Sequence, residues 1–234
     1  MSRPAPSLRL GVLNPNTSPE VTEVLDRHAR SVARAGTTVV TLRPTHGPSA
    51  VEGWSDAYRS VPGMLDRLAS LEQPLDALVL AGFGDVGLEA LREALAVPVV
   101  DMTEAGVATA RSLGRRYGVV TTVAAMVDPI RSSLSVSGLT DRNVGVEPIE
   151  VGIAECAVPE VVLPRLIDAA KLLVDRGADA VCLGSAVLIP YAAALCYEVG
   201  VPVVDPLAAA IAVLESAYLL TPVGGRAAGP PRSI

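Results

Sequence analysis

The sequence contains two copies of one pattern, and this internal repeat constrains the fold more than any other feature. Residues 76–101 and 179–205 both open with Asp-Ala, continue through an apolar run, a small-residue turn and a helical segment, and close on Val-Pro-Val-Val-Asp. A weaker correspondence relates residues 9–16 to 117–124, where an apolar run ends in a polar turn. The repeat therefore predicts two similar halves related by a pseudo-twofold axis.

Short β-branched runs alternate with longer helical patterns along the whole chain. Strands that are apolar throughout are buried on both faces, which is typical of a parallel sheet covered by helices on each side. The sequence therefore predicts an α/β fold with mostly parallel sheets. We expect strands at 8–13, 38–42, 76–81, 97–101, 117–121, 144–151, 179–184 and 201–205, and helices near 19–35, 55–70, 85–95, 103–114, 126–138, 158–176, 189–199 and 206–220.

The repeat also suggests how the chain divides. We expect residues 1–103 together with 206–220 to form the first α/β half, residues 104–205 to form the second, and the Gly- and Pro-rich residues 221–234 to form a disordered tail. Ligands bind at the carboxyl ends of the strands in open α/β sheets. The active site is therefore expected in the cleft between the halves, where Gly82 and Ser185 occupy equivalent positions of the repeat.

The composition argues against several classes of function. Apolar residues make up 50% of the chain and charged residues 19%, as in a compact globular protein. The net charge of −6 argues against a nucleic-acid partner. Lys171 is the only lysine and lies in the middle of an expected helix, so Schiff-base and pyridoxal-phosphate chemistry are not expected.

The cysteines and the apolar runs lead to further expectations. Cys156, Cys182 and Cys196 lack metal-ligand spacing, so no metal site is expected; Cys182 and Cys196 are expected to be buried, inert thiols. No apolar signal-peptide core or membrane span is apparent, so we expect a cytoplasmic protein with no membrane partner. The high apolar content favours a homo-oligomer.

Four polar loops are expected to meet in the cleft. Amide side chains and backbone N–H groups at helix N-termini hold an anionic oxygen, such as that of a carboxylate or an enolate. The same residues could instead cap helices and strand ends, with Ser18 as an N-cap before Pro19. The residues expected to bind a substrate are Asn14, Asn16, Gly82, Phe83, Gly84, Thr121, Thr122 and Ala186.

A catalytic base is harder to choose. The candidates are Asp85, Glu52, His46 and Asp101, and a solvated surface role competes with catalysis for Glu52. The glycines of residues 82–87 with Asp101 also match the dinucleotide-binding fingerprint, although they follow 75 residues with two strands of their own. An NAD-dependent oxidoreductase is therefore an alternative.

Several stretches of the chain match a known family. The chain resembles hydantoin racemases of the aspartate/glutamate/hydantoin racemase superfamily over residues 8 to about 220. The resemblance implies two similar α/β halves, an active site between them and cofactor-independent racemisation of a small molecule. The stretches that carry it are GVLNPNTS (11–18), GPSAVEG (47–53), GFGDVGLEALRE (82–93), VPVV (97–100), EAG (104–106), ADAVCLGSA (178–186) and GVPVVDP (200–206).

The resemblance also implies a difference from that family. Its members use two cysteine thiols on opposite faces of the substrate's α-carbon, and these correspond here to Gly82 and Ser185. Glycine has no side chain, and a serine hydroxyl is a weak acid and a weak base unless it is activated, whereas a thiol pKa of about 8.5 lies near working pH. Ser185, Asp85 and Glu52 are then the catalytic candidates.

We therefore predict a family member that has diverged from two-thiol racemisation. It would act at a carbon next to a carbonyl or carboxylate of a small molecule by enolate stabilisation, in a lyase, decarboxylase, isomerase or cyclase reaction without a metal or organic cofactor. Two further explanations of the sequence remain open: a hydantoin racemase engineered to be inactive at both cysteines, and a non-catalytic homologue that binds a small molecule.

Overall fold

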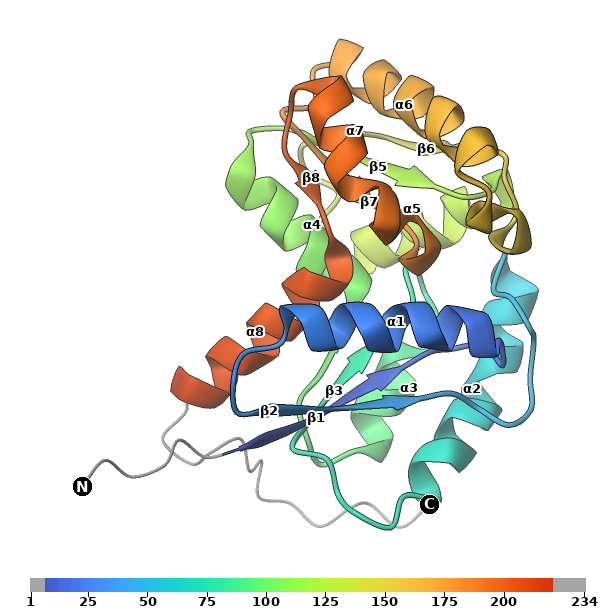
Figure 1. Cartoon of the computed structure of the whole chain (residues 1–234), viewed down its shortest axis with the longest axis vertical. Coiled ribbons are helices and arrows are strands. Elements are labelled where there is room, and N and C mark those ends of the chain that lie inside the picture. Colours follow the sequence, from blue (N-terminus) through green and yellow to red (C-terminus); the bar gives the residue numbers. More distant parts are fainter. Residues whose placement is uncertain (1–6, 221–234) are drawn as a thin grey trace.

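Two four-stranded parallel sheets form the framework of the protein (Figure 1). The computed structural model describes residues 7–220, so the expected tail at 221–234 lies outside the described residues. The predicted α/β class and parallel sheets are confirmed. The first sheet has the order β2-β1-β3-β4 and the second β6-β5-β7-β8. The strands are β1 (Leu8–Leu13), β2 (Thr37–Leu42), β3 (Ala77–Leu80), β4 (Val99–Asp101), β5 (Tyr117–Thr121), β6 (Asn143–Pro148), β7 (Ala180–Leu183) and β8 (Val203–Val204).

Helices cover both sheets, and two of them begin later than the sequence suggests. The helix expected at 85–95 begins at Leu88, because Gly84 and Gly87 adopt positive φ angles of 93° and 90°. The helix expected at 189–199 is preceded by a 3-10 turn that contains Pro190. The α-helices are α1 (Pro19–Val32), α2 (Trp54–Ala69), α3 (Leu88–Ala94), α4 (Met102–Leu113), α5 (Val127–Val136), α6 (Pro159–Asp175), α7 (Ala192–Val199) and α8 (Pro206–Leu220), and the 3-10 helices are η1 (Ala124–Met126), η2 (Ile153–Ala157) and η3 (Ala186–Tyr191).

Helices α4 and α8 carry the chain across between the two halves. Helix α4 follows β4 of the first sheet but packs on β7 and β8 of the second, while α8 follows β8 and packs on α1, β3 and β4. The closing aspartate of each repeat caps these helices: Asp101 accepts from the Glu104 N–H at 2.7 Å, and Asp205 from the Leu207 N–H at 2.9 Å. These contacts support the proposed division into 1–103 with 206–220 and 104–205.

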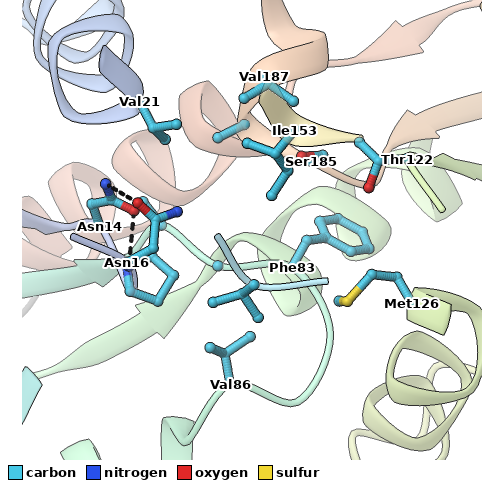
Figure 2. A pocket seen from close by; sticks show the side chains of 16 residues that line it. Asn14, Asn16, Val21, Phe83, Val86, Thr122, Met126, Ile153, Ser185 and Val187 are labelled. Atoms are coloured by element: carbon cyan, nitrogen blue, oxygen red, sulfur yellow. Dashed lines mark hydrogen bonds between the residues drawn. The ribbon is translucent and has the colours of Figure 1, made fainter. Parts of the chain in front are cut away.

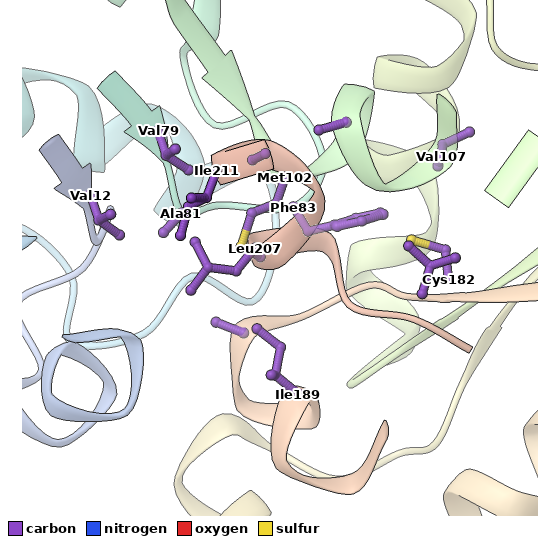
Figure 3. Close-up of a cluster of buried hydrophobic side chains, with 14 of the residues drawn as sticks. Val12, Val79, Ala81, Phe83, Met102, Val107, Cys182, Ile189, Leu207 and Ile211 are labelled. Carbon is purple, nitrogen blue, oxygen red and sulfur yellow. The ribbon is translucent and has the colours of Figure 1, made fainter. Parts of the chain in front are cut away.

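One continuous apolar cluster joins the halves around the two crossing helices (Figure 3). Val12 and Val79 contribute from the first sheet, Cys182 from the second, and Met102 and Leu207 from the first turns of α4 and α8. Each of these side chains is completely buried. Burial of apolar surface at this shared core therefore holds the carboxyl ends of both sheets toward one another. Within residues 7–220, no helix is long and apolar enough to cross a lipid bilayer.

The close approach of α4 and α8 predicts that Gly106→Ala destabilises the protein. A Cβ atom at Gly106 would lie 2.8 Å from the Pro206 Cβ and 2.9 Å from the Cys182 Sγ. Alanine favours a helix over glycine by about 1 kcal/mol, but overpacking costs about 1–3 kcal/mol, so we expect a lower free energy of unfolding in urea. The exposed Ala108 on the same helix supplies the control, since Ala108→Val should change stability by less than about 1 kcal/mol. A Gly106→Ala protein as stable as the wild type would contradict this account.

The ion pair between His28 of α1 and Asp205 predicts a pH-dependent stability. The hydrogen bond that the His28 imidazole makes with the Asp205 carboxylate raises the pKa of His28 above the ordinary value of 6.5. The stability that protonated His28 gives the folded protein is therefore fully present below about pH 6.5. It is lost as the pH rises through the raised pKa that His28 has in the folded state. In urea titrations, His28→Gln should cost most stability at about pH 5.5–6.5 and progressively less above it. His46→Gln is the control, because His46 pairs with Asp66 on the exposed surface; a pH-independent effect of His28→Gln would refute the linkage.

Candidate active site between the two halves

A small cavity of about 40 Å³ lies where loops from both sheets meet (Figure 2). The loops follow β1, β3, β5 and β7, which are the two central strands of each sheet. The structure therefore brings together the four polar loops that the sequence singled out. The predicted residues that line the cavity are Asn14, Asn16, Gly82, Phe83, Thr122, Ser185 and Ala186.

The two asparagines have different positions in a buried hydrogen-bond network. The Asn14 amide nitrogen lies 2.9 Å from the Asn16 Oδ1 and 3.0 Å from the Thr22 Oγ1, and its Oδ1 accepts from the Asn16 backbone N–H at 3.1 Å. The Asn16 Oδ1 also accepts from the Ser18 N–H at 3.0 Å. Asn14 is therefore fully engaged within the protein. The Asn16 Nδ2 has no acceptor among residues 7–220, and Figure 2 shows it facing the cavity.

Further hydrogen-bond donors come from the second half and from the turn after β3. Ser185 precedes η3, and its side chain makes no capping hydrogen bond. The N–H groups at the start of a helix have no intrahelical acceptor, which leaves that of Ala186 available. The Phe83 N–H follows β3, and the Thr122 hydroxyl lies beside Ser185 in Figure 2.

The other side chains around the cavity are apolar and the lining is uncharged. Val21, Val86, Met126, Ile153 and Val187 form the remaining walls in Figure 2. Nothing in the sequence pointed to these residues, because apolar side chains that line a cavity look the same in sequence as those that fill a core. The lining drawn from residues 7–220 includes no Asp, Glu, Lys, Arg, His or Cys.

Two residues expected to bind a substrate do not line the cavity. The Gly84 N–H donates to the Thr103 Oγ1 at 2.8 Å, so this amide is already engaged inside the protein. The Thr121 hydroxyl is fully buried and approaches the Gly184 carbonyl oxygen at 3.4 Å, behind the cavity wall. In both cases the polar group has a partner distant in sequence, so neither group faces the cavity.

None of the four candidate bases lines the cavity either. Glu52 accepts a hydrogen bond from the Ile153 N–H at 2.7 Å, and Asp85 lies outside the lining. His46 pairs with Asp66 at 3.4 Å on the exposed surface. Asp101 caps α4, and burial raises its pKa to about 7. With Gly84 and Asp101 both engaged inside the protein, the dinucleotide-binding alternative gains no support.

The cysteines lie away from this cavity. Cys182 is buried in β7, where burial raises its thiol pKa, and burial raises the pKa of Cys156 to about 11. Cys196 was expected to be buried but is exposed, because it lies on the outer face of α7. Among residues 7–220, no group of three His, Cys, Asp or Glu side chains is arranged to hold a metal ion.

The fold and the cavity define a two-sheet α/β protein whose strand ends face one another, and comparison with known proteins identifies its family. The sequence model of Asp/Glu/Hydantoin racemase matches residues 10–214. The chain is 32% identical over 212 residues to a hydantoin racemase from Pseudomonas sp. (strain NS671), covering 89% of this chain and 85% of that protein. It is 33% identical over 214 residues to a hydantoin racemase from Rhizobium meliloti, covering 89% and 88%.

A solved structure is also highly similar. The allantoin racemase from Pseudomonas fluorescens superimposes with a TM-score of 0.90 at 34% identity, covering 97% of this chain and 99% of that chain. The family match spans most of the chain, and the relatives align over nearly their whole length. The chain therefore belongs to the Asp/Glu/hydantoin racemase family.

The buried network predicts that Asn14→Ala lowers the free energy of unfolding by about 2–3 kcal/mol, because the Thr22 hydroxyl, the Asn16 N–H and the Ser18 carbonyl each lose a partner. Urea denaturation monitored by circular dichroism measures this effect. Gln73→Ala, at an exposed position, is the control and should be nearly neutral. Equal stability of the two variants would show that the hydrogen bonds of Asn14 do not stabilise the loop after β1.

Proposed function

We propose that the chain is a racemase-family enzyme that acts at the carbon next to a carbonyl of a small neutral molecule and stabilises an enolate-like oxygen. The observation that best supports this proposal is that uncharged hydrogen-bond donors from both halves line one small cavity. They are the Asn16 Nδ2, the N–H groups of Phe83 and Ala186, and the hydroxyls of Thr122 and Ser185. Fixed donors of this kind stabilise charge that develops only in the transition state.

The uncharged lining supports a neutral substrate rather than an amino acid or a dicarboxylate. A bound carboxylate would lose its hydration in a cavity whose lining supplies no Lys, Arg or His from residues 7–220. The names of the similar proteins, hydantoin racemase and allantoin racemase, refer to uncharged ring imides. A hydantoin-type ring therefore fits the cavity chemistry better than aspartate or glutamate does.

A two-thiol mechanism does not fit this chain. By resemblance, Gly82 and Ser185 stand at the positions of the family's two cysteines. A Cβ at Gly82 would lie 3.1 Å from the Val86 Cγ2 and 3.4 Å from the Pro15 Cγ, so Val86 would have to shift slightly to admit a side chain there. Glycine itself supplies no proton-transfer group at position 82.

Ser185 is then the proposed proton-transfer residue, and it acts from one side of the substrate only. Its hydroxyl lines the cavity and makes no capping bond, so it is free to donate toward the enolate. Solvent hydroxide takes the α-proton and becomes water, and Ser185 gives a proton to the carbon. Water then reprotonates the Ser185 alkoxide, which restores the hydroxide ion. Enolate stabilisation lowers the barrier for both transfers, although neither has the thiolate base of the two-cysteine enzymes.

The proposed function predicts that the protein accelerates exchange of the C5 proton of 5-methylhydantoin in D2O above the rate in buffer. Proton NMR measures this rate. Ser185→Ala should slow the catalysed exchange by about 10²-fold, because it removes a positioned proton donor. Aspartate and glutamate should not exchange, because the cavity lining offers no cation to their carboxylates.

The control is Ser135→Ala, at an exposed serine on α5, which should exchange at the wild-type rate. Exchange no faster than in buffer would contradict catalysis, and 5-methylhydantoin binding without exchange would instead identify a non-catalytic binding protein. Wild-type exchange by Ser185→Ala would remove Ser185 from the mechanism. Exchange of aspartate at the hydantoin rate would refute the neutral-substrate part of the proposal.

A further inference from the structure

The turn between β3 and α3 is held in place by a single backbone hydrogen bond. Among the N–H groups of residues 82–87, only that of Gly84 has an acceptor within residues 7–220, and this acceptor is the Thr103 Oγ1 at 2.8 Å. Gly84 and Gly87 have positive φ angles, and glycine has more conformational freedom to lose on folding than any other residue. The shape of this turn therefore depends on contacts from outside it.

The residue that supplies the acceptor lies on a rigid support. Thr103 is completely buried in the first turn of the crossing helix α4. Asp101 caps this turn through the Glu104 N–H at 2.7 Å, and Arg92 of α3 binds the Glu104 carboxylate at 2.6 Å. The first turn of α4 is therefore fixed both to the end of β4 and to α3, the helix that follows the glycine turn.

The second half of the repeat has no equivalent of this hydrogen bond. After Val-Pro-Val-Val-Asp, the first copy continues with Met102 and Thr103, and the second with Pro206 and Leu207. Leucine cannot accept a hydrogen bond from the turn after β7. That turn enters the 3-10 helix η3 directly, and the Leu188 N–H donates to the Ser185 carbonyl oxygen at 3.2 Å. A supporting hydroxyl is therefore present only in the half whose turn is rich in glycine.

We propose that Thr103 positions the Phe83 N–H toward the substrate's carbonyl oxygen. The inference rests on the proposed function and identifies what holds one of its donors in place. The Phe83 side chain is fixed in the shared apolar cluster (Figure 3), and the peptide that follows Phe83 is fixed by the bond from Gly84 to Thr103. The Phe83 N–H has no acceptor within residues 7–220, so it is held and free to donate. A donor fixed before the reaction stabilises an enolate without reorganising.

The test measures the rate of C5 proton exchange of 5-methylhydantoin in D2O as a function of its concentration. Thr103→Val keeps the shape of the side chain and removes the hydroxyl. It should lower kcat by about tenfold or more, because a displaced donor stabilises the enolate less well. KM should stay within about twofold, since the neutral carbonyl gains less from the donor than the enolate does. Thr103→Ala should have the same effect and serves if the valine variant does not fold.

Two further variants separate positioning from general stability. Thr103→Ser retains a hydroxyl and should keep kcat within about threefold of the wild type. Thr109→Val is the matched control on the same helix, because the Thr109 hydroxyl bonds only to the Ala105 carbonyl oxygen at 2.8 Å. It should exchange 5-methylhydantoin at the wild-type rate.

NMR of the amides gives a readout that needs no turnover. The Gly84 N–H should exchange with D2O faster in Thr103→Val than in the wild type, because it has lost its acceptor. Thr103→Ser and Thr109→Val should retain the wild-type amide exchange. An unchanged Gly84 amide in Thr103→Val would show that the hydroxyl does not hold the turn, and this would overturn the inference.

Three kinetic results would also overturn it: a wild-type kcat in Thr103→Val, an equal loss of kcat in Thr109→Val, or a Thr103→Ser variant as slow as Thr103→Val. In each case catalysis by the wild type would leave the proposed function standing.

Failure of the proposed function itself is recognised by a wild type that does not accelerate exchange. A titration with 5-methylhydantoin then tests the positioning alone. The Phe83 amide resonance should shift on binding in the wild type and in Thr109→Val, and should shift much less in Thr103→Val. The absence of this difference would overturn the positioning role together with the catalytic proposal.

Discussion

The packing of α4 against α8 is the constraint on which the rest of the structure depends. Each helix leaves the half in which its preceding strand lies and packs on the other half, so the two helices cross at the junction. Gly106 lets Pro206 approach to within contact distance, and the shared apolar cluster surrounds this point. Because the closing strands end here, the turns after β3 and β7 face a common space, and the small cavity follows from that geometry.

The fold could be predicted from the sequence because its signals are local. Strands buried on both faces read as continuous apolar runs, and the repeated Val-Pro-Val-Val-Asp ends with an aspartate that caps the next helix. The element ends were less predictable. Gly84 and Gly87 delay α3 through positive φ angles, and a glycine in sequence does not announce which conformation it adopts.

The site was predictable only to the level of loops. Parallel strands bring their following turns to one edge, so the sequence order alone placed Asn16, Phe83, Thr122 and Ser185 together. It could not assign the partner of each polar group. Glu52 pairs with Ile153 and Gly84 with Thr103 through contacts that the tertiary packing sets. Residue type alone therefore made Glu52 look available for catalysis and Gly84 for substrate binding.

The pseudo-symmetric frame surrounds a chemically asymmetric site. Equivalent turns follow β3 and β7, but the first presents Gly82 and the second presents a hydroxyl at Ser185. A frame with two similar proton-transfer groups would favour inversion at carbon, because each face of the substrate would have its own acid or base. With one hydroxyl and one glycine, the proposed enolate-stabilising site would treat the two faces of the substrate differently.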